Sequence, residues 1–295
     1  MCMTEALEGL LKLLDLEPIE VNIFRGISPD IERQRVFGGQ VAAQALIAAG
    51  KTVDKGSVHS LHSYFLRPGD PTVPILYEVD RIRDGRSFVT RRVVAIQHGK
   101  AIFNMSASFH VAEEGLEHGS AMPEVPSPEE LPTLRERLAP WADQLGDFLN
   151  RPQPIDQRFV GELPWNKEVG PRPPRQQLWI RANGQIQEDP LLHAAVITYA
   201  SDMSLFDSIL LPHKIRWDDP RFMGASLDHC MWFHRPFKAD EWLLYDQESP
   251  AAYGARGLAR ASLFTQDGTI VCSLAQEGLI RIRKDLPPAI SPGEG

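Results

Sequence analysis

The sequence predicts an α+β fold made of two tandem modules, each with an antiparallel sheet wrapped around one central helix. An alanine-rich segment near residues 38–51 has a helical pattern and almost no charged face. A run of strand-like segments follows it, with side chains alternating between apolar and polar. The same order of elements returns in the second half of the chain at a nearly constant spacing, which indicates a duplication.

The composition is that of an ordinary globular protein. The chain has 295 residues, of which 43% are hydrophobic and 24% charged, so it can form a sizeable core and is not disordered throughout. The formal net charge of −8 gives no general attraction for nucleic acids or anionic membranes, and we expect neither as a partner. No apolar run approaches about 18 residues, so we expect no transmembrane helix.

The termini and the cysteines predict a cytoplasmic protein. The first residues carry acids among apolar side chains, unlike a secretory signal peptide, and the last residues carry no lipidation or peroxisomal address. Cys2, Cys230 and Cys272 are odd in number and widely spaced, so they form neither a disulfide framework nor a metal-binding pair. This usage suggests a reducing compartment.

The first half begins with two helices of different character. Residues 4–15 place leucines at helical spacing behind Thr4, a candidate N-cap, which predicts a short amphipathic helix. The segment 38–51 opens with two glycines and closes near a third. Because it has almost no charged face, we expect this helix to be buried on most sides.

From residue 58 onward the pattern changes to alternation with β-branched and aromatic residues. HGK at 98–100 predicts a tight hairpin turn. A buried helix followed by antiparallel strands gives an α+β unit whose sheet must wrap the helix. The four expected strands cover residues 58–68, 74–85, 87–100 and 101–110.

A long segment separates the two halves. Residues 112–175 hold 11 of the 24 prolines together with polar helical fragments. We interpret them as a connector with short helices, because a loop of this length is improbable inside one compact unit. The chain is therefore expected to contain an N-terminal module over residues 1–111, this connector, and a C-terminal module over residues 176–288.

The second half repeats the first. Residues 189–203 predict a helix with Asp189 as N-cap and Pro190 at the first helical position. YFLRP at 64–68 matches WFHRP at an offset of 168, and HGK matches DGT at an offset of 169. Two copies of one module follow from this order. The strands expected after the second helix cover residues 225–236, 241–251, 255–269 and 270–280.

Five motifs resemble the type II acyl-CoA thioesterases, and the resemblance runs from about residue 5 to 285. It implies a double hotdog fold, in which each antiparallel sheet curls around one long helix. Such helices face each other closely, and Ala42, Ala45 and Ala49 would permit that approach. The motifs are RVFGGQVAAQAL (35–46), HSLHSYFLRPGD (59–70), YASDMSLFD (199–207), LDHCMWFHRPF (227–237) and LAQEGLIR (274–281).

The resemblance implies a catalytic group of Asp202, Ser226 and Gln276, which together bind and activate one water molecule. Thr is common at the middle position of the family, and Ser226 supplies an equivalent hydroxyl. The leaving thiol has a pKa of roughly 8.5 in solution, so it needs little help from an acid. The main task is then to orient and deprotonate water, with Asp202 as the base.

We expect the developing oxyanion to bind at the start of the helix over residues 38–51. Gly38, Gly39 and Gln40 would present free backbone N–H groups there, next to the substrate. The first module would also form one wall of the acyl tunnel.

The duplication predicts one working site per chain. At the offset of 169, Gln276 corresponds to Ala107. Counting back from the aligned strands, the region of Asp202 corresponds to Gly50 or its neighbours, where no acid occurs. The first module therefore lacks both the acid and the amide.

Other polar residues have structural interpretations. His59 and His62 point to opposite faces of a strand, as do His229 and His234, so we expect no metal site. Asp228 is interpreted as an ion-pairing or turn residue. Arginines also cluster on successive strands, where they form either a solvated sheet edge or a binding surface for CoA phosphates. They are Arg81, Arg83, Arg86, Arg91 and Arg92.

We predict an acyl-CoA thioesterase that hydrolyses fatty acyl-CoA, of medium to long chain by the family resemblance, without cofactor or covalent intermediate. Its partner is the acyl-CoA substrate, and a homo-oligomer is expected by family analogy. Two alternatives stay open. One is a hotdog enoyl-CoA hydratase, which would use an Asp–His pair, and the other is a non-catalytic acyl-CoA binding or sensor protein.

Overall fold

The computed structural model describes residues 3–29, 35–142, 152–164, 166, 170–213, 215, 217 and 219–286. Its first half has two helices and six strands. They are α1 (Glu5–Leu14), β1 (Glu17–Glu20), β2 (Ile23–Gly26), α2 (Gly38–Gly50), β3 (Ser57–Phe65), β4 (Ile75–Asp84), β5 (Phe88–Gln97) and β6 (Lys100–His110).

The second half repeats this order after a set of short helical turns. Those turns are η1 (Pro128–Glu130), α3 (Leu134–Leu138) and η2 (Ala139–Trp141). Then follow β7 (Ile155–Val160), β8 (Arg175–Ala182), α6 (Pro190–Ser201), α7 (Asp207–Leu210), η3 (Leu211–His213), β9 (Phe222–Ser226), β10 (Asp228–Phe233), β11 (Leu243–Tyr253), β12 (Arg256–Thr265) and β13 (Ile270–Ile282).

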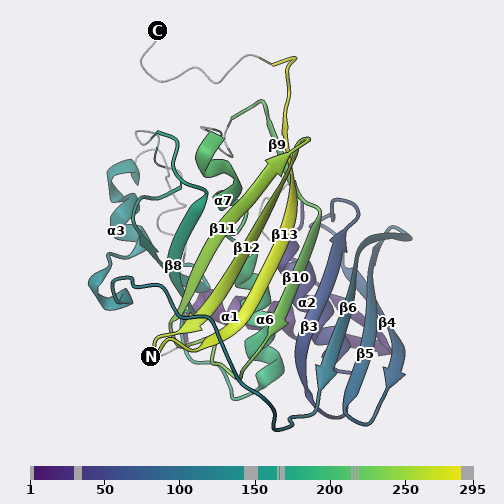
Figure 1. Cartoon of the computed structure of the whole chain (residues 1–295). Helices are drawn as coiled ribbons and strands as arrows, with labels where there is room; N and C mark the ends of the chain where they lie inside the picture. Colours follow the sequence, from purple (N-terminus) through teal and green to yellow (C-terminus); the bar gives the residue numbers. More distant parts are fainter. Residues whose placement is uncertain are drawn as a thin grey trace.

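The strands form one antiparallel sheet in the order β1-β2-β4-β5-β6-β3-β10-β13-β12-β11-β8-β7, and β9 pairs with β13 beside this path. The two halves meet where β3 pairs with β10, with Leu61 opposite Met231 (Figure 1). Counted outward from this seam, β6 corresponds to β13, β5 to β12, β4 to β11, β2 to β8 and β1 to β7. The predicted α+β class and the repeated module are confirmed by this order.

The symmetry also concerns the start of the second module. β7 lies inside residues 112–175, the segment expected to be a connector, yet it pairs with β8 as the counterpart of β1. This favours placing the start of the second module at β7 rather than at residue 176. The short strands β1, β2, β7 and β8 were not predicted, because none has a long alternating apolar pattern.

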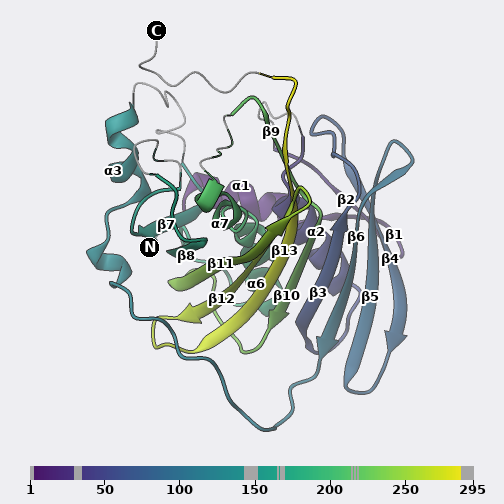
Figure 2. The ribbon, with the colours of Figure 1, turned by 45° about the horizontal axis from the view of Figure 1, so that its top comes forward.

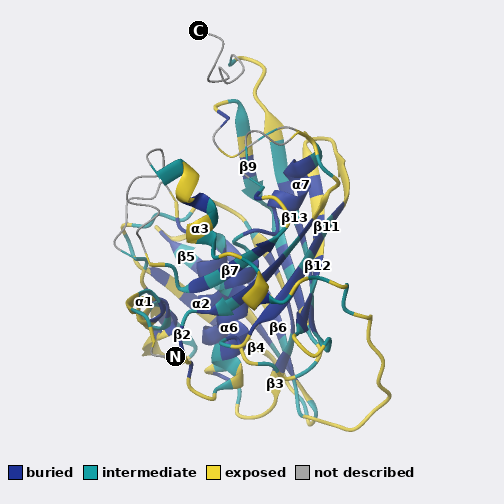
Figure 3. Cartoon of the chain, turned by 90° about the vertical axis from the view of Figure 1, so that its left-hand side faces the viewer, coloured by how far each residue is buried: buried dark blue, intermediate teal, exposed yellow. Residues whose placement is uncertain are grey.

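Helices α2 and α6 lie against the inner face of the sheet (Figures 1 and 2). Every residue of α2 from Gly39 to Ala49 is buried (Figure 3). Helix α6 is apolar nearly all around. The two helices run antiparallel. A Cβ atom at Gly39 would lie 2.5 Å from the carbonyl oxygen of Tyr199, and one at Gly50 would overlap Leu191. Glycine is therefore needed at Gly39, where the neighbour is backbone, whereas at Gly50 the flexible Leu191 side chain could move aside.

Two buried glutamines fasten α2 to the chain before it. Gln44 Nε2 donates to the carbonyl oxygens of Leu13 and Ile27, and Gln44 Oε1 accepts from the Tyr77 hydroxyl at 2.7 Å. Gln40 Nε2 donates to the Ile27 carbonyl oxygen at 3.1 Å and to Ser28 Oγ at 3.2 Å. Buried amides whose hydrogen bonds are satisfied can lie in an apolar core at little cost in folding free energy.

Several local predictions are confirmed. Thr4 caps α1, Asp189 caps α6, and His98 and Gly99 form the turn between β5 and β6 with φ of 48° and 69°. The expected strand over residues 225–236 is instead interrupted at Leu227, between β9 and β10. Leu227 donates its N–H to Glu277 and accepts from Phe65 N, so it links the two halves of the sheet.

The described residues contain two cysteines, Cys230 and Cys272, and both carry free thiols, while Cys2 lies outside those residues. In the part of the chain that the structure describes, no helix has both the length and the apolar character needed to cross a membrane.

The close contact between α2 and α6 predicts opposite effects of two Gly→Ala substitutions. Gly39→Ala would push a methyl group into the backbone of Tyr199, and we expect the free energy of unfolding to fall by about 1–3 kcal/mol. Gly9→Ala lies in the exposed part of α1, where an added Cβ meets nothing within 4 Å, and should raise it by about 0.5–1 kcal/mol. Urea denaturation of both variants measures the difference; equal changes of the same sign would contradict the packing.

Candidate active site

Asp202 lies at the point where the two modules meet. It is the C-cap of α6, and the antiparallel helix packing brings it to the start of α2. Its Oδ2 accepts the backbone N–H of Gly39 at 2.8 Å. The N-cap of α2, Phe37, has no side-chain oxygen to offer. The carboxylate from the second module therefore caps the positive end of a first-module helix.

Ser226 and Gln276 complete a polar cluster around this carboxylate. Ser226 ends β9, and Gln276 lies in the middle of β13, next to which β9 runs. Gln276 Nε2 donates to Asp202 Oδ1 at 2.8 Å and to Ser226 Oγ at 2.7 Å. Ser226 Oγ lies 3.5 Å from Asp202 Oδ1. The structure thus brings the three residues singled out in the sequence within hydrogen-bonding distance of each other.

Burial changes the acidity of Asp202. Removal of the carboxylate from water raises its pKa above the ordinary value, because the charged form is the one that loses hydration. The nearby His229 and the hydrogen bonds from Gln276, Gly39 and Ser226 act in the opposite direction. A carboxylate with a raised pKa is a stronger base, which suits proton abstraction from water.

His229 is the polar neighbour that the sequence did not reveal. It is only 1% exposed, on the inner face of β10, and its Nδ1 lies 3.3 Å from Gln276 Oε1. Its Nε2 lies 2.9 Å from Ser201 Oγ. The alternation argument correctly placed His229 and His234 on opposite faces, but it did not indicate which face carried the site. The inward-facing Met231, two residues on, is the signal that could have identified it.

The hydrogen bonds favour one tautomer of His229. Since both donors of Gln276 point to Asp202 and Ser226, its Oε1 faces Nδ1 of His229, and this contact is a hydrogen bond in the tautomer with the proton on Nδ1. Burial lowers the pKa of His229 below its ordinary value, and Asp202 and Gln276 offset only part of this effect. The imidazole thus donates to Gln276 and fixes the orientation of its amide group.

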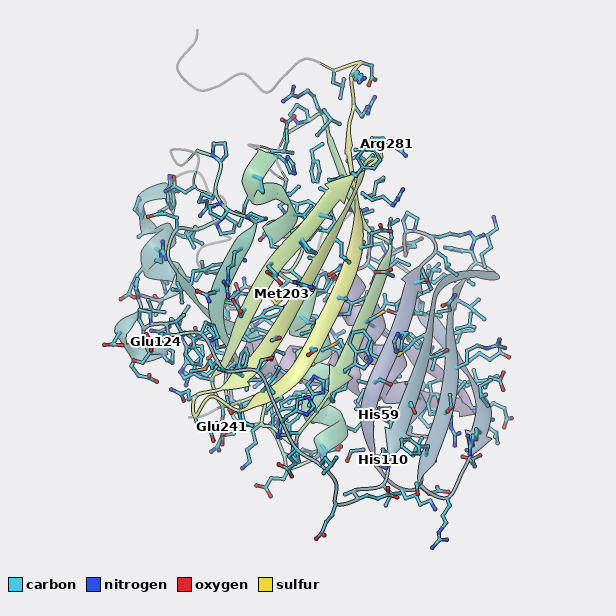
Figure 4. All side chains as sticks on the ribbon, in the orientation of Figure 1. His59, His110, Glu124, Met203, Glu241 and Arg281 are labelled. Atoms are coloured by element: carbon cyan, nitrogen blue, oxygen red, sulfur yellow. The ribbon has the colours of Figure 1, made fainter. Side chains whose placement is uncertain are left out.

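A cavity of about 530 Å³ opens beside the carboxylate and is lined by both modules. Asp202, Ser226 and Met203 form part of its wall, and Met203 lies near the middle of the molecule, behind β11 and β12 in Figure 4. This size is typical of a small-molecule site with a few polar groups in an apolar lining. The apolar side chains that line it from the first module are Val36, Phe37, Val41, Phe65, Leu66, Pro68, Ile102 and Phe103.

The expected oxyanion site at the start of α2 is only partly supported. Gly38 lines the cavity. The N–H of Gly39 is not free, since it donates to Asp202, and the side chain of Gln40 points to Ile27 and Ser28. The expectation of a free Gly39 N–H was wrong because the sequence could not show that α6 ends against this helix. Substrate binding by the backbone N–H groups of Gly38 and Gln40 stays a prediction.

A second carboxyl group lines the same cavity. Asp207 is buried at the start of α7, and Trp217 Nε1 donates to its Oδ1 at 2.7 Å. Burial raises the pKa of Asp207 to about 7, against the opposing effect of the Trp217 hydrogen bond. The cavity therefore contains two carboxyl groups whose charged forms are disfavoured by burial.

The first module carries no copy of the polar cluster. Ala107 on β6 occupies the position that Gln276 has on β13, and Gly50 ends the helix that corresponds to α6. Among the described residues there is also no group of three or more His, Cys, Asp or Glu arranged to hold a metal ion. The carboxyl, hydroxyl and amide groups of the polar cluster come from the second module.

Family models match both halves of the chain. One described as acyl-CoA thioesterase matches residues 148–279, and one described as acyl-CoA thioesterase N-terminal domain matches residues 27–110. Acyl-coenzyme A thioesterase 8 of Homo sapiens is 42% identical over 92% of this chain and 88% of its own. Acyl-CoA thioesterase 2 of Haemophilus influenzae is 39% identical over 95% and 99% of the two chains.

Solved structures agree with this likeness. An acyl-CoA thioesterase II from Mycobacterium marinum superimposes with a TM-score of 0.78 at 43% identity, covering 94% of this chain and 100% of its own. A protein from Alicyclobacillus acidocaldarius described as having a hot dog fold superimposes with a TM-score of 0.76 at 18% identity, which supports the fold alone.

The raised pKa of Asp207 predicts a pH-dependent stability. Between about pH 4 and pH 7 the unfolded chain releases this proton while the folded chain retains it, so the free energy of unfolding falls by about 1.4 kcal/mol per pH unit from this group. Asp207→Asn keeps the acceptor for Trp217 and cannot ionise. The gain in the free energy of unfolding of Asp207→Asn over wild type should therefore be larger at pH 8 than at pH 5.

Urea denaturation of wild type, Asp207→Asn and the exposed control Asp54→Asn at both pH values measures this effect. An Asp207→Asn difference that does not exceed that of Asp54→Asn would contradict the burial of a protonated Asp207.

Proposed function

The chain belongs to the acyl-CoA thioesterase family and is an acyl-CoA hydrolase, and we propose that it works through Asp202, Ser226 and Gln276 with water as the nucleophile. The observation that carries this proposal is the contact of all three residues beside a cavity lined by both modules. Each residue has hydrogen-bonding capacity left after these contacts.

Asp202 and Ser226 together have the groups needed to hold one water molecule. A carboxylate has about four acceptor positions, and three are occupied by Gly39, Gln276 and Ser226. Ser226 Oγ accepts from Gln276 and keeps a second lone pair. A water bound between Asp202 and Ser226 would donate to both and direct its own lone pair toward the thioester carbonyl. Such fixed orientation accelerates attack by a proximity effect.

The reaction then needs one proton transfer in each direction. Water forms a bond to the acyl carbon while its proton passes to Asp202. The tetrahedral intermediate collapses with cleavage of the carbon–sulfur bond, and the CoA thiolate leaves with the electron pair. Asp202 returns the proton to the sulfur, so the products are the free acid and CoA. A thiolate is a good leaving group because its conjugate acid has a pKa of roughly 8.5.

His229 acts as a positioning residue in this scheme. It touches Gln276 on the side away from Asp202, and the proton on its Nδ1 prevents the amide from flipping. A flipped amide would present its oxygen to the carboxylate and to Ser226, losing two hydrogen bonds. Ser201, at the end of α6, holds the other imidazole nitrogen.

The remaining features of the function are the length of the acyl chain, the oligomeric state and the location of the protein. We propose medium- to long-chain acyl groups, supported by the aromatic and aliphatic lining that the first module contributes to the cavity. A homo-oligomer and a cytoplasmic location remain predictions from the family resemblance and the sequence. The contact of Asp202, Ser226 and Gln276 beside the cavity argues against a pure binding protein.

Replacement of the base should abolish turnover. Asp202→Asn keeps the size of the side chain but removes the negative charge, and we expect kcat to fall at least about 10²-fold. Asp228→Asn is the matched control, because Asp228 Oδ1 accepts the backbone N–H of Glu277 and Asn retains that acceptor. A thiol reagent with saturated acyl-CoA substrates of increasing length measures both variants and the chain-length preference.

Near-normal turnover by Asp202→Asn would rule out this base. Absence of thiol release by the wild-type chain itself would favour the binding-only alternative, and a hydratase could not act on the saturated substrates.

Loss of His229 should change the pH profile as well as the rate. In His229→Leu the Gln276 amide loses its fixed orientation, which weakens its hydrogen bond to Asp202, one of the contacts that lower the pKa of this carboxyl. We expect a lower kcat, and a rising limb of the kcat profile displaced to higher pH, because Asp202 then ionises less readily. His229→Asn can donate from Nδ2 to Gln276 and should recover part of both effects. A rate loss with an unshifted profile would mean that His229 is only a packing residue.

A further inference from the structure

We propose that Arg35 and Arg67 form an anion subsite for the phosphate groups of the CoA moiety. The inference rests on the proposed function, because it assumes that the thioester lies at Asp202. Arg35 and Arg67 are the two basic residues among those that line the catalytic cavity. Both are exposed, as residues at the mouth of a cavity would be.

Arg67 is held in place without being neutralised. It follows β3, and both its own backbone N–H and that of Leu66 donate to the Ile102 carbonyl oxygen, which fixes the chain at this point. Its Nη1 donates to the Ala101 carbonyl oxygen at 2.6 Å. A backbone carbonyl orients the guanidinium group but does not cancel its charge. The remaining N–H donors are left for a ligand.

Arg35 also belongs to the first module, and a backbone carbonyl oxygen of the second module holds its side chain. It precedes α2, and its Nη2 donates to the Gly224 carbonyl oxygen on β9 at 3.0 Å. Ser226 lies two residues further along the same strand. The contact thus places a cation on the cavity wall close to the element that carries the catalytic hydroxyl.

The absence of carboxylate partners distinguishes these two arginines. In the described ranges neither forms an ion pair, although arginines elsewhere commonly do, as Arg92 does with Asp80 and Arg175 with Asp246. Two unpaired, oriented cations are unusual features for the cavity of a protein with a net charge of −8. Planar guanidinium groups suit bidentate binding of phosphate oxygens.

Three of the five arginines that the sequence suggested for this role have partners, and Arg83 and Arg86, like them, do not line the cavity. Arg91 is buried and bonded to Thr52 and Asp84. Arg92 pairs with Asp80, and Arg81 donates to Asn22 at 2.8 Å. All three lie outside the set of residues that line the cavity. The structure therefore favours the cavity mouth over the strand cluster as the place for the phosphates.

The test compares substrates that share the thioester and differ in their phosphates; the pantetheine ester also lacks the adenosine. An acyl-CoA, the matching acyl-dephospho-CoA and the matching acyl-pantetheine present the same thioester with three, two and no phosphate groups. Arg35→Gln and Arg67→Gln should each raise KM for acyl-CoA roughly tenfold with little change in kcat, and leave KM for acyl-pantetheine unchanged. Retention of the effect with acyl-dephospho-CoA assigns an arginine to the pyrophosphate, and its loss assigns it to the 3′-phosphate.

Controls make the outcome decisive. Arg81→Gln and Arg92→Gln remove the same charge from the strand cluster and should leave KM unchanged, while Arg35→Lys and Arg67→Lys keep the charge and should recover part of the affinity. Binding of free CoA, measured by calorimetry, should weaken in the two Gln variants and lose part of its salt dependence.

Two results would overturn the subsite: unchanged KM and CoA affinity in the Arg35→Gln, Arg67→Gln double variant, or an equal rise of KM for acyl-pantetheine. Failure of the proposed function looks different. In that case the wild-type chain would release no thiol from acyl-pantetheine, whereas the calorimetric binding of CoA would still report on Arg35 and Arg67.

Discussion

The antiparallel contact between α2 and α6 is the constraint on which the rest of the structure depends. It requires glycine where the helices come closest, and it brings the last residue of α6 to the first turn of α2. Asp202 there caps a helix that has no polar cap of its own. The hydrogen bond from Gly39 therefore serves two purposes at once: it joins the modules, and it holds the carboxylate beside the cavity.

This arrangement explains why a duplicated fold carries one polar cluster. The sheet is symmetric about the seam between β3 and β10, but the side chains at equivalent positions differ. The second module supplies Asp202, Ser226 and Gln276, while the first supplies the helix terminus that meets the carboxylate and most of the apolar wall. Neither module could form the cavity alone, because the lining residues come from both.

Charge is distributed unevenly around the cavity. Burial disfavours ionisation of Asp202 and of Asp207, which lies on the same wall. The exposed arginines Arg35 and Arg67 are oriented by backbone carbonyls and keep their charge. The buried part of the cavity disfavours negative charge, and the arginines at its opening attract it. This distribution suits a substrate with an uncharged acyl chain and a phosphorylated carrier.

Much of this protein is determined by the sequence alone. The alternation of residues 58–110 indicates strands, because a period of two places every second side chain on the same face of a sheet. The alanine-rich segment 38–51 indicates a buried helix, because it has no polar face to turn toward water. The recurrence at offsets of 168 and 169 revealed the duplication, and the motifs around Asp202, Ser226 and Gln276 identified the cluster.

Only the tertiary structure decided how these parts meet. The N–H of Gly39 is occupied by Asp202, His229 faces inward against Gln276, Arg91 is buried against Thr52, and Arg67 is oriented by the Ala101 carbonyl oxygen. Each of these facts joins residues far apart in the chain. Local periodicity fixes the faces of an element, but the choice of the face that meets a partner depends on packing between elements, which local patterns do not encode.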